Sequence, residues 1–141
     1  MAGDPAAPVP FGPYLVYEQL GVGGMASVHR AEARGIEGFS RQVALKRMLP
    51  HLAGNEEFVR AFVREARLAS LLRHTNVAQT YDLGLVDGIY YIAMELIEGR
   101  DLRSVLRQSS LATGPMPVPI ALNLIAQICE ALDYAHNLCD E

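Results

Sequence analysis

The single lysine of the chain, Lys46, lies in the segment "QVALKRM" (42–48), and every other basic residue among the twelve Lys and Arg is arginine. A lysine ammonium is a compact point charge that contacts two anions together, whereas an arginine guanidinium is a broad planar fork. A sequence that uses arginine everywhere else therefore indicates that position 46 requires a point charge. We predict that Lys46 lies between two anionic groups.

A glycine-rich segment, "LGVGGMASV" (20–28), is the candidate for one of those anionic sites. Glycines allow positive φ angles and close approach of the backbone to a ligand. Successive exposed N–H groups in such a turn attract phosphate oxygens. A glycine cluster between two strands is also an ordinary hairpin turn, so this segment alone leaves both interpretations open.

The same glycines fit a second phosphate-binding pattern, the dinucleotide fingerprint G-x-G-x-x-G/A, at Gly21, Gly23 and Ala26. That fingerprint opens a full helix and needs an acidic residue at the end of the next strand. Here only "SVHRAEAR" separates the glycines from Gly35, and the next strand ends in Lys46 and Arg47. The dinucleotide interpretation fails on both requirements.

Glu65 is the candidate for the second anion next to Lys46. Residues 55–73 have helical periodicity, and a projection at about 100° per residue places Glu65 in an apolar stripe. The stripe consists of Phe58, Phe62, Ala69 and Leu72. A carboxylate on the buried side of a helix costs several kcal/mol unless it is paired, which predicts a contact with Lys46. The alternative is a solvated Glu65 at the margin of the stripe, with Lys46 on the surface of its strand.

The elements that position these residues follow from alternation, helical periodicity and turn residues. We predict strands at 14–20, 27–33, 41–49, 76–88 and 89–97. Helices are expected at 55–73, capped by Asn55, then at 100–108 and from 119 onward. Three strands before the first helix, joined by tight hairpins, indicate an α+β fold with a five-stranded antiparallel sheet.

Four segments in this order resemble the protein kinases, specifically the bacterial serine/threonine kinases of the eukaryotic type. They are "LGVGGMASV", "VALK", "FVREARLASLLRHTNV" and "YYIAMELIEGRDL". The resemblance covers residues 14–141 and departs from the pattern at Ala26, which replaces the third loop glycine. It implies a flexible lead-in at 1–13, an ATP-binding kinase N-lobe and hinge at 14–98, and two helices of an incomplete C-lobe at 99–141.

The resemblance also implies roles for individual residues, with ATP as the cofactor. Lys46 would contact the α- and β-phosphates and pair with Glu65, which makes these two the candidate catalytic residues. The loop over the phosphates would comprise Leu20, Gly21, Val22, Gly23, Gly24, Met25, Ala26, Ser27 and Val28. Leu20, Val28 and Ala44 would enclose the adenine, with Met94 as the gatekeeper. Backbone groups of Glu95 and Ile97 would bind its edge, and Asp101 would lie near the ribose.

The part of the kinase pattern that performs catalysis is missing from the sequence. Neither H-R-D-x-x-x-x-N nor D-F-G occurs, so the ligands for Mg²⁺ in a complete kinase are absent here. The chain looks like a kinase cut short before its catalytic loop, inactive alone, whose complete form would phosphorylate Ser/Thr hydroxyls of an unidentified protein. The alternative is a non-catalytic half-kinase that binds nucleotide or another protein.

Composition limits the location and the partners. A net charge of −4 and a pI near 5.5 argue against a nucleic-acid surface. The N-terminus lacks the features of a signal peptide, and "IALNLIAQICEAL" is too short and too polar to span a bilayer. Cys129 and Cys139 are expected to be reduced core thiols in a cytoplasmic protein. An apolar stripe on the last helix is expected to be exposed and to cause self-association. It comprises Ala121, Leu124, Ile125, Ile128, Leu132 and Ala135.

Overall fold

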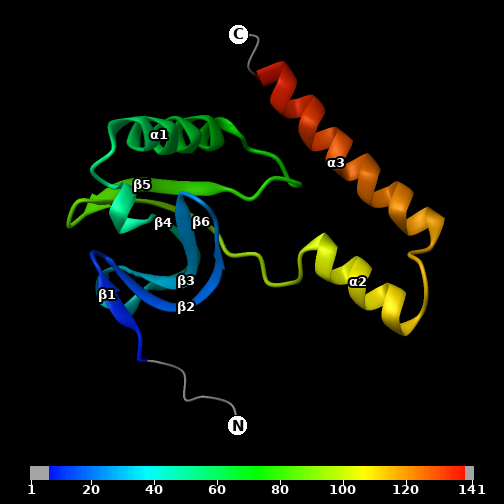
Figure 1. Ribbon diagram of the computed structural model, residues 1–141, viewed down its shortest axis with the longest axis horizontal. Helices are drawn as coiled ribbons and strands as arrows, with labels where there is room; N and C mark the ends of the chain where they lie inside the picture. Colours follow the sequence, from blue (N-terminus) through cyan, green and yellow to red (C-terminus); the bar gives the residue numbers. More distant parts are fainter. Residues whose placement is uncertain (1–6, 139–141) are drawn as a thin grey trace. The chain divides into compact units, whose positions relative to one another are not determined.

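The computed structural model describes residues 7–138 and contains an antiparallel sheet and three α-helices (Figure 1). The chain divides into two compact units, which differ in content. The first unit, up to Arg73 together with Ala78–Leu96, holds the sheet and helix α1. The second unit, His74–Val77 and the residues from Ile97 onward, holds helices α2 and α3. This division supports the predicted α+β class.

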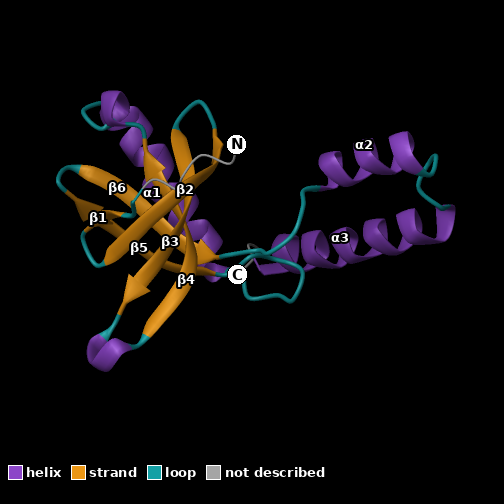
Figure 2. Ribbon diagram, turned by 90° about the horizontal axis from the view of Figure 1, so that it is seen from below, coloured by secondary structure: helices purple, strands orange, loops and turns teal. Residues whose placement is uncertain are grey.

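The sheet has six strands in the order β1-β2-β3-β4-β6-β5, and all neighbours are antiparallel. It curls strongly on itself (Figure 2). The strands are β1 Val9–Phe11, β2 Tyr14–Val22, β3 Ala26–Arg34, β4 Ser40–Met48, β5 Thr80–Val86 and β6 Ile89–Glu95. Short 3-10 helices, η1 Ile36–Gly38 and η2 Pro50–Leu52, precede and follow β4.

The additional strand β1 corrects two expectations, the five-stranded sheet and the flexible lead-in over residues 1–13. Gly12 has a φ of +53°, a left-handed conformation that suits glycine and reverses the chain after Phe11. Phe11 then pairs with Tyr14, and β1 extends the sheet beyond β2. Residues 1–6 of the predicted lead-in lie outside the described part of the chain.

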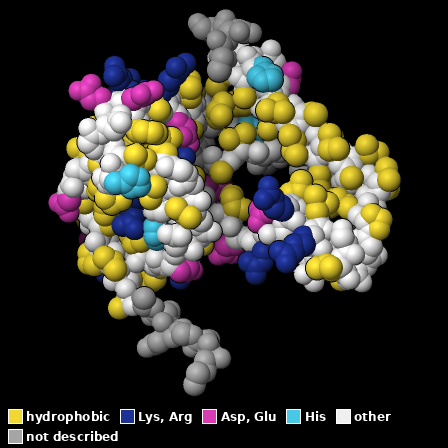
Figure 3. All heavy atoms as spheres, viewed as in Figure 1, with side chains coloured by type: hydrophobic (Ala, Val, Ile, Leu, Met, Phe, Trp, Pro, Cys, Tyr) yellow, Lys and Arg dark blue, Asp and Glu magenta, His cyan; other side chains and the backbone are white. Residues whose placement is uncertain are grey.

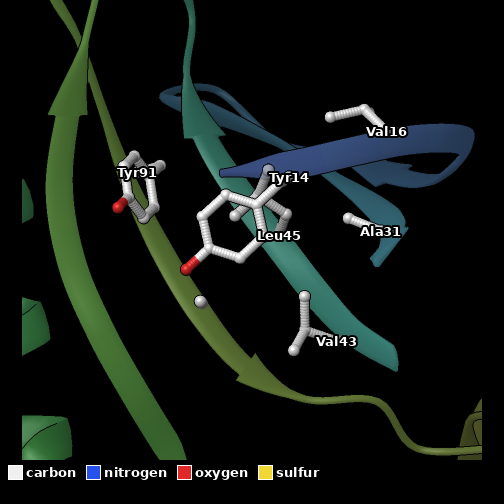
Figure 4. Close-up of a cluster of buried hydrophobic side chains, with 7 residues drawn as sticks. Tyr14, Val16, Ala31, Val43, Leu45 and Tyr91 are labelled. Carbon is white, nitrogen blue, oxygen red and sulfur yellow. The ribbon is translucent and has the colours of Figure 1, made fainter. Parts of the chain in front are cut away.

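The main core lies inside the curl of the sheet and is formed by alternate residues of its strands (Figure 4). Its buried members are Tyr14, Val16, Ala31, Val43, Leu45, Tyr91 and Ala93. The Tyr14 and Tyr91 rings meet edge to face with centroids 5.2 Å apart. Their hydroxyls donate to Asp82 Oδ2 at 3.5 Å and 3.1 Å, respectively. Burial, followed by the neighbouring Asp82 charge and hydrogen bond, raises the pKa of the Tyr91 phenol.

Helix α1, Glu56–Leu71, confirms the predicted helix and its cap. The Asn55 side chain accepts hydrogen bonds from the backbone N–H groups of Glu57 and Phe58 at 3.0 Å and 3.4 Å. Such a cap satisfies N–H groups that have no partner inside the helix. The Asn55 cap therefore fixes the residue at which α1 begins, shortly after η2.

A second core cluster, called here the α1 cluster, joins this helix to the sheet. It consists of Ala26, Met48, Phe62, Ala66 and Ile92. Phe62 and Ala66 are the two buried residues of α1. The predicted apolar stripe was correct at Phe62, which is buried. It was wrong at Phe58, which is 38 % exposed.

The second unit contains α2, Leu102–Ala112, and α3, Val118–Leu138. The short segment 74–77 contacts α3, since Asn76 Nδ2 donates to the Gln127 carbonyl at 3.1 Å. No described residue of α3 is buried. Cys129 is free and exposed, which corrects its expected place in a core, and Cys139 lies outside the described residues.

The length of α3 also corrects the sequence-based argument about a membrane span. The helix has 21 residues, and by length and composition alone it could cross a membrane. The segment judged too short was only its central part. Core helices of globular domains pass the same test, so this property by itself is weak evidence.

Gly84 provides a test of the main core. A Cβ atom at this position would overlap the hydroxyl oxygen of Tyr91 and lie 2.5 Å from its ring. Because Asp82 and the neighbouring core hold that ring, Gly84→Ala is expected to destabilise the fold by about 1–3 kcal/mol. Urea unfolding measures the change. Gly54→Ala is the matched control, since nothing lies within 4 Å of its Cβ, and equal losses in both variants would contradict this packing.

Candidate functional site

The centre of the candidate site is the ion pair between Lys46 on β4 and Glu65 on α1. Lys46 Nζ lies 2.6 Å from Glu65 Oε1, which confirms the predicted contact. The ammonium also lies 5.8 Å from the centroid of the Phe62 ring. The two side chains are therefore paired, but Glu65 is half-exposed at the margin of the apolar stripe, as the alternative interpretation placed it.

The Lys46–Glu65 pair is less buried than the sequence predicts. The Glu65 side chain is 48 % exposed, and the Lys46 side chain is 21 % exposed. Glu65 therefore lies at the edge of the buried face of α1, three residues after Phe62. Partly exposed ion pairs contribute only about 0–1 kcal/mol to stability. The contact positions Lys46 more than it stabilises the fold.

Strand alternation explains why Lys46 points towards α1. Met48, two residues along β4, belongs to the α1 cluster, whereas Leu45 belongs to the core inside the curl. Lys46 shares the face of Met48, and Glu65 shares the inner side of α1 with Phe62. The burial of Met48 and Phe62 in the same cluster therefore brings the two charged groups together.

The glycine segment forms the hairpin between β2 and β3, at the sheet position next to Lys46. The register pairs Gly21 with Val28, and Val28 with Lys46. The Gly23 N–H donates to the Ala26 carbonyl at 2.8 Å, closing the turn. The segment is thus a hairpin turn in geometry, and its base lies beside the ammonium.

The loop is anchored on one side and exposed on the other. Ala26 is buried in the α1 cluster, and the Met25 carbonyl accepts from the Leu49 N–H at 3.0 Å. Gly21 and Gly24 have no atom within 4 Å of a Cβ built on them. The other loop residues differ in the exposure of their side chains. Leu20 and Val22 are exposed, whereas Met25, Ser27 and Val28 are half-buried.

Three of the residues predicted to surround a base lie on the Lys46 face of the sheet. Val28 is paired with Lys46, and Ala44 is paired with Met94 across β4 and β6. Ala44 is buried, and its methyl group leaves a small, apolar surface two residues before Lys46. The sheet register therefore collects Val28, Ala44 and Met94 next to the charged pair.

The remaining predicted residues lie at the end of β6 and in the second unit. The Glu95 N–H donates to the Gln79 carbonyl at 2.8 Å, so a contact of Glu95 with a base would use its carbonyl oxygen. Ile97 is exposed. Asp101 caps α2 by accepting from the N–H and hydroxyl of Ser104 at 2.9 Å and 2.7 Å. The Ser104 hydrogen bonds lower the pKa of Asp101 below its usual value.

A pair that the sequence analysis missed, Arg47 and His29, lies on the opposite face of β4 from Lys46. Arg47 Nη2 is 3.3 Å from His29 Nε2, and the guanidinium lies 5.2 Å from the Phe11 ring centroid. Burial, and then the Arg47 charge, lower the pKa of His29. The alternation of side chains along β4 is the sequence signal that could have placed Arg47 on the inner face.

Comparison with known proteins identifies the family. The family model described as "Protein tyrosine and serine/threonine kinase" matches residues 15–138. The chain belongs to the protein kinase family. This match includes the glycine hairpin, Lys46, Glu65 and helices α1 to α3, and it confirms the resemblance found in the sequence.

Curated relatives are bacterial kinases. The chain is 41 % identical over 132 residues to the tyrosine-protein kinase MasK of Myxococcus xanthus. It is 42 % identical over 126 residues to the serine/threonine-protein kinase PrkC of Bacillus subtilis. These alignments cover 94 % and 89 % of the chain, but only 20 % and 18 % of the relatives. The chain therefore spans about a fifth of the length of these kinases.

Solved kinase structures confirm the fold. The PknI kinase domain of Mycobacterium tuberculosis matches with a TM-score of 0.73 and 32 % identity. The match covers 94 % of this chain and 51 % of the PknI kinase-domain chain. The kinase-like fold is thus shown, with six strands described here rather than the five expected.

The Arg47–His29 contact predicts acid sensitivity. The folded state holds the pKa of His29 below the usual 6.5, so the unfolded chain binds a proton first as the pH falls. The stability that the neutral His29 contributes is fully present above pH 6.5, and it is lost as the pH falls through the pKa of His29 in the folded state. His29→Gln is expected to flatten the dependence of urea-unfolding stability on pH between about 7 and 5. An unchanged slope would contradict this contribution of His29.

Proposed function

We propose that residues 14–98 bind ATP as part of a kinase that transfers the γ-phosphate to Ser/Thr hydroxyls of proteins. The observation that carries this proposal is the Lys46–Glu65 contact at the base of an exposed glycine hairpin. A lone ammonium held by one carboxylate, with backbone N–H groups beside it, suits the oxygens of a polyphosphate. Ala44, Val28 and Met94 add an apolar surface for the base.

Each residue has a distinct task in this proposal. Lys46 binds the α- and β-phosphates, and Glu65 holds the Lys46 side chain in the orientation for that contact. The loop from Leu20 to Val28 covers the phosphates with N–H groups other than that of Gly23, which donates to the Ala26 carbonyl. ATP supplies the phosphoryl group, and Mg²⁺ would neutralise its charge in a complete kinase. Among residues 7–138, no group of three or more His, Cys, Asp or Glu residues converges on a metal site.

Serine/threonine specificity is supported by the names of the relatives. PrkC is a serine/threonine-protein kinase, and so is PksC of Streptomyces coelicolor, which is 39 % identical over 131 residues. MasK, by contrast, is named a tyrosine-protein kinase. We therefore assign protein hydroxyls as the substrate class and favour Ser and Thr within it.

The chain alone is proposed to bind nucleotide without transferring phosphate. The catalytic-loop and D-F-G motifs, which supply the catalytic and metal-binding Asp residues, do not occur in its sequence. The same fact supports the alternative of a non-catalytic nucleotide-binding or protein-interaction module. We assign Mg²⁺ binding to a complete kinase and not to these residues.

The proposed location is cytoplasmic, with α3 as a helix of the kinase domain. The family match runs through the whole of α3, which favours a domain helix over a membrane span. A net charge of −4 disfavours nucleic acid as a partner. The protein substrate remains the expected partner of the complete kinase.

Nucleotide titration tests the assigned role of Lys46. Lys46→Ala is expected to weaken ATP binding about tenfold or more, because a charge-assisted phosphate contact is lost. The free energy of unfolding should change by only about 1 kcal/mol, since the ion pair is partly exposed. Isothermal calorimetry and urea unfolding supply the two values. Arg41→Ala, elsewhere on β4, is the control, and equal ATP affinities for wild type and Lys46→Ala would refute the role.

The exposed face of α3 predicts self-association of the isolated chain. Ile125, Ile128 and Leu132 are 55 %, 49 % and 50 % exposed, and Figure 3 shows apolar side chains along the helix. Apolar surface of this extent favours burial against another molecule. Sedimentation velocity is expected to show concentration-dependent oligomers, reduced in Ile125→Gln/Leu132→Gln. A monodisperse monomer with a cooperative melt would contradict this expectation.

A further inference from the structure

The outer side of α1 carries a groove that the proposed nucleotide site does not use. It has a volume of about 470 Å³ and is lined by Val59, Arg60, Val63, Arg64, Arg67 and Leu68. We call these six residues the α1 groove. Buried Phe62 and Ala66 lie on the other side of the helix, against the sheet. The α1 groove is therefore a surface distinct from the Lys46–Glu65 contact.

The charges of the α1 groove are all positive and regularly spaced. Arg60, Arg64 and Arg67 recur at intervals of four and three residues, so they form one stripe of about 10 Å along the helix. Arg60 is 3.7 Å from Glu56. Within the described chain, Arg64 and Arg67 have no ion-pair partner. Figure 3 shows basic side chains standing out over α1, with acidic side chains beside them.

The apolar part of the groove lies beside these arginines, with Val59 and Val63 on one side of the stripe and Leu68 on the other. Val59 and Val63 are half-buried, and Leu68 is 49 % exposed. A second hollow of about 340 Å³ shares Val59 and Arg60 and continues to Tyr90, Ala53, Gly54 and the acidic Glu56. A row of cations flanked by apolar side chains favours a ligand with both apolar and acidic side chains.

We propose that the α1 groove binds an acidic amphipathic helix of a partner protein. Its Asp or Glu residues, spaced three or four apart, would face Arg60, Arg64 and Arg67. Its apolar side chains would fill the space over Val59, Val63 and Leu68. This is the helix-in-groove mode, in which residues three and four apart serve as anchors.

Two other occupants fit the groove less well. A second copy docking through a two-fold axis would place the same arginine stripe against itself, and like charges repel. A nucleic acid would satisfy the arginines, but Val59, Val63 and Leu68 provide no aromatic surface on which a base could stack. A peptide with carboxylates and apolar side chains matches both features.

The test uses the 141-residue chain and a displayed library of random 16-residue peptides. Peptides are selected on wild type and counter-selected on Arg64→Gln/Arg67→Gln. The selected sequences are expected to carry at least two acidic residues beside apolar ones. Selection of no peptide, or of peptides without acidic enrichment, would overturn the proposal.

A selected peptide, synthesised with a fluorescent label, is then measured by anisotropy. Binding should weaken about fivefold or more in Arg64→Gln/Arg67→Gln, and it should fall as salt rises. Val63→Ser should also weaken binding while the salt dependence stays. Arg103→Gln/Arg107→Gln on α2 is the matched control, with the same loss of charge and no expected effect.

Three outcomes would reassign the groove and overturn the proposal. The first is an equal loss of binding in the α2 control, which would show an effect of net charge only. The second is binding of a single-stranded oligonucleotide that disappears in Arg64→Gln/Arg67→Gln. The third is self-association that depends on those two arginines. ATP titration of the same variant, expected to match wild type, separates this proposal from that for the nucleotide site.

Discussion

The candidate site depends most on the interface between the sheet and α1, where Met48 and Phe62 are buried in one cluster and Lys46 contacts Glu65 at 2.6 Å. The apolar contact holds α1 on the sheet, and the charged contact orients the Lys46 side chain. An ion pair with a half-exposed carboxylate contributes too little energy to hold a helix on a sheet. The burial of Phe62 and Ala66 does so, and the ion pair then forms at the edge of that interface.

Both faces of β4 are used, and they differ in character. One face presents Ala44, Lys46 and Met48 towards the candidate nucleotide site and α1, while Val43 and Leu45 point into the curl of the sheet. Arg47 follows them on that inner side and contacts His29. A single strand thus connects the core, the charged pair and the glycine hairpin, because the hairpin strand β3 is its direct neighbour.

The sequence was sufficient for the elements with long, regular patterns. The alternation around Val43–Lys46 and the cap at Asn55 predicted β4 and α1 within two residues of their bounds. The rarity of lysine and the spacing of Glu65 from Phe62 predicted the charged contact. Strand β1 was missed, because three residues that include Pro10 carry little alternation, and its place depends on the turn at Gly12.

Features that depend on three-dimensional contacts could not be predicted. Phe58 appeared equivalent to Phe62 on a helical projection, but the sheet covers only part of that stripe and leaves Phe58 exposed. The His29–Arg47 contact depends on the register of β3 with β4. Cys129 was predicted to lie in a core because free cysteines are commonly buried. In the structure this residue is exposed.

Because Lys46 is the only lysine, NMR on a sample labelled with ¹³C and ¹⁵N in lysine side chains yields one Cε–Nζ correlation from this ammonium. This spectrum tests the Lys46–Glu65 contact and its nucleotide role most directly. The account predicts that the correlation shifts in Glu65→Gln and shifts again when ATP is added to wild type. Glu57→Gln, in the first turn of the same helix, should leave it in place. A correlation whose position changes neither in Glu65→Gln nor on addition of ATP would contradict the account.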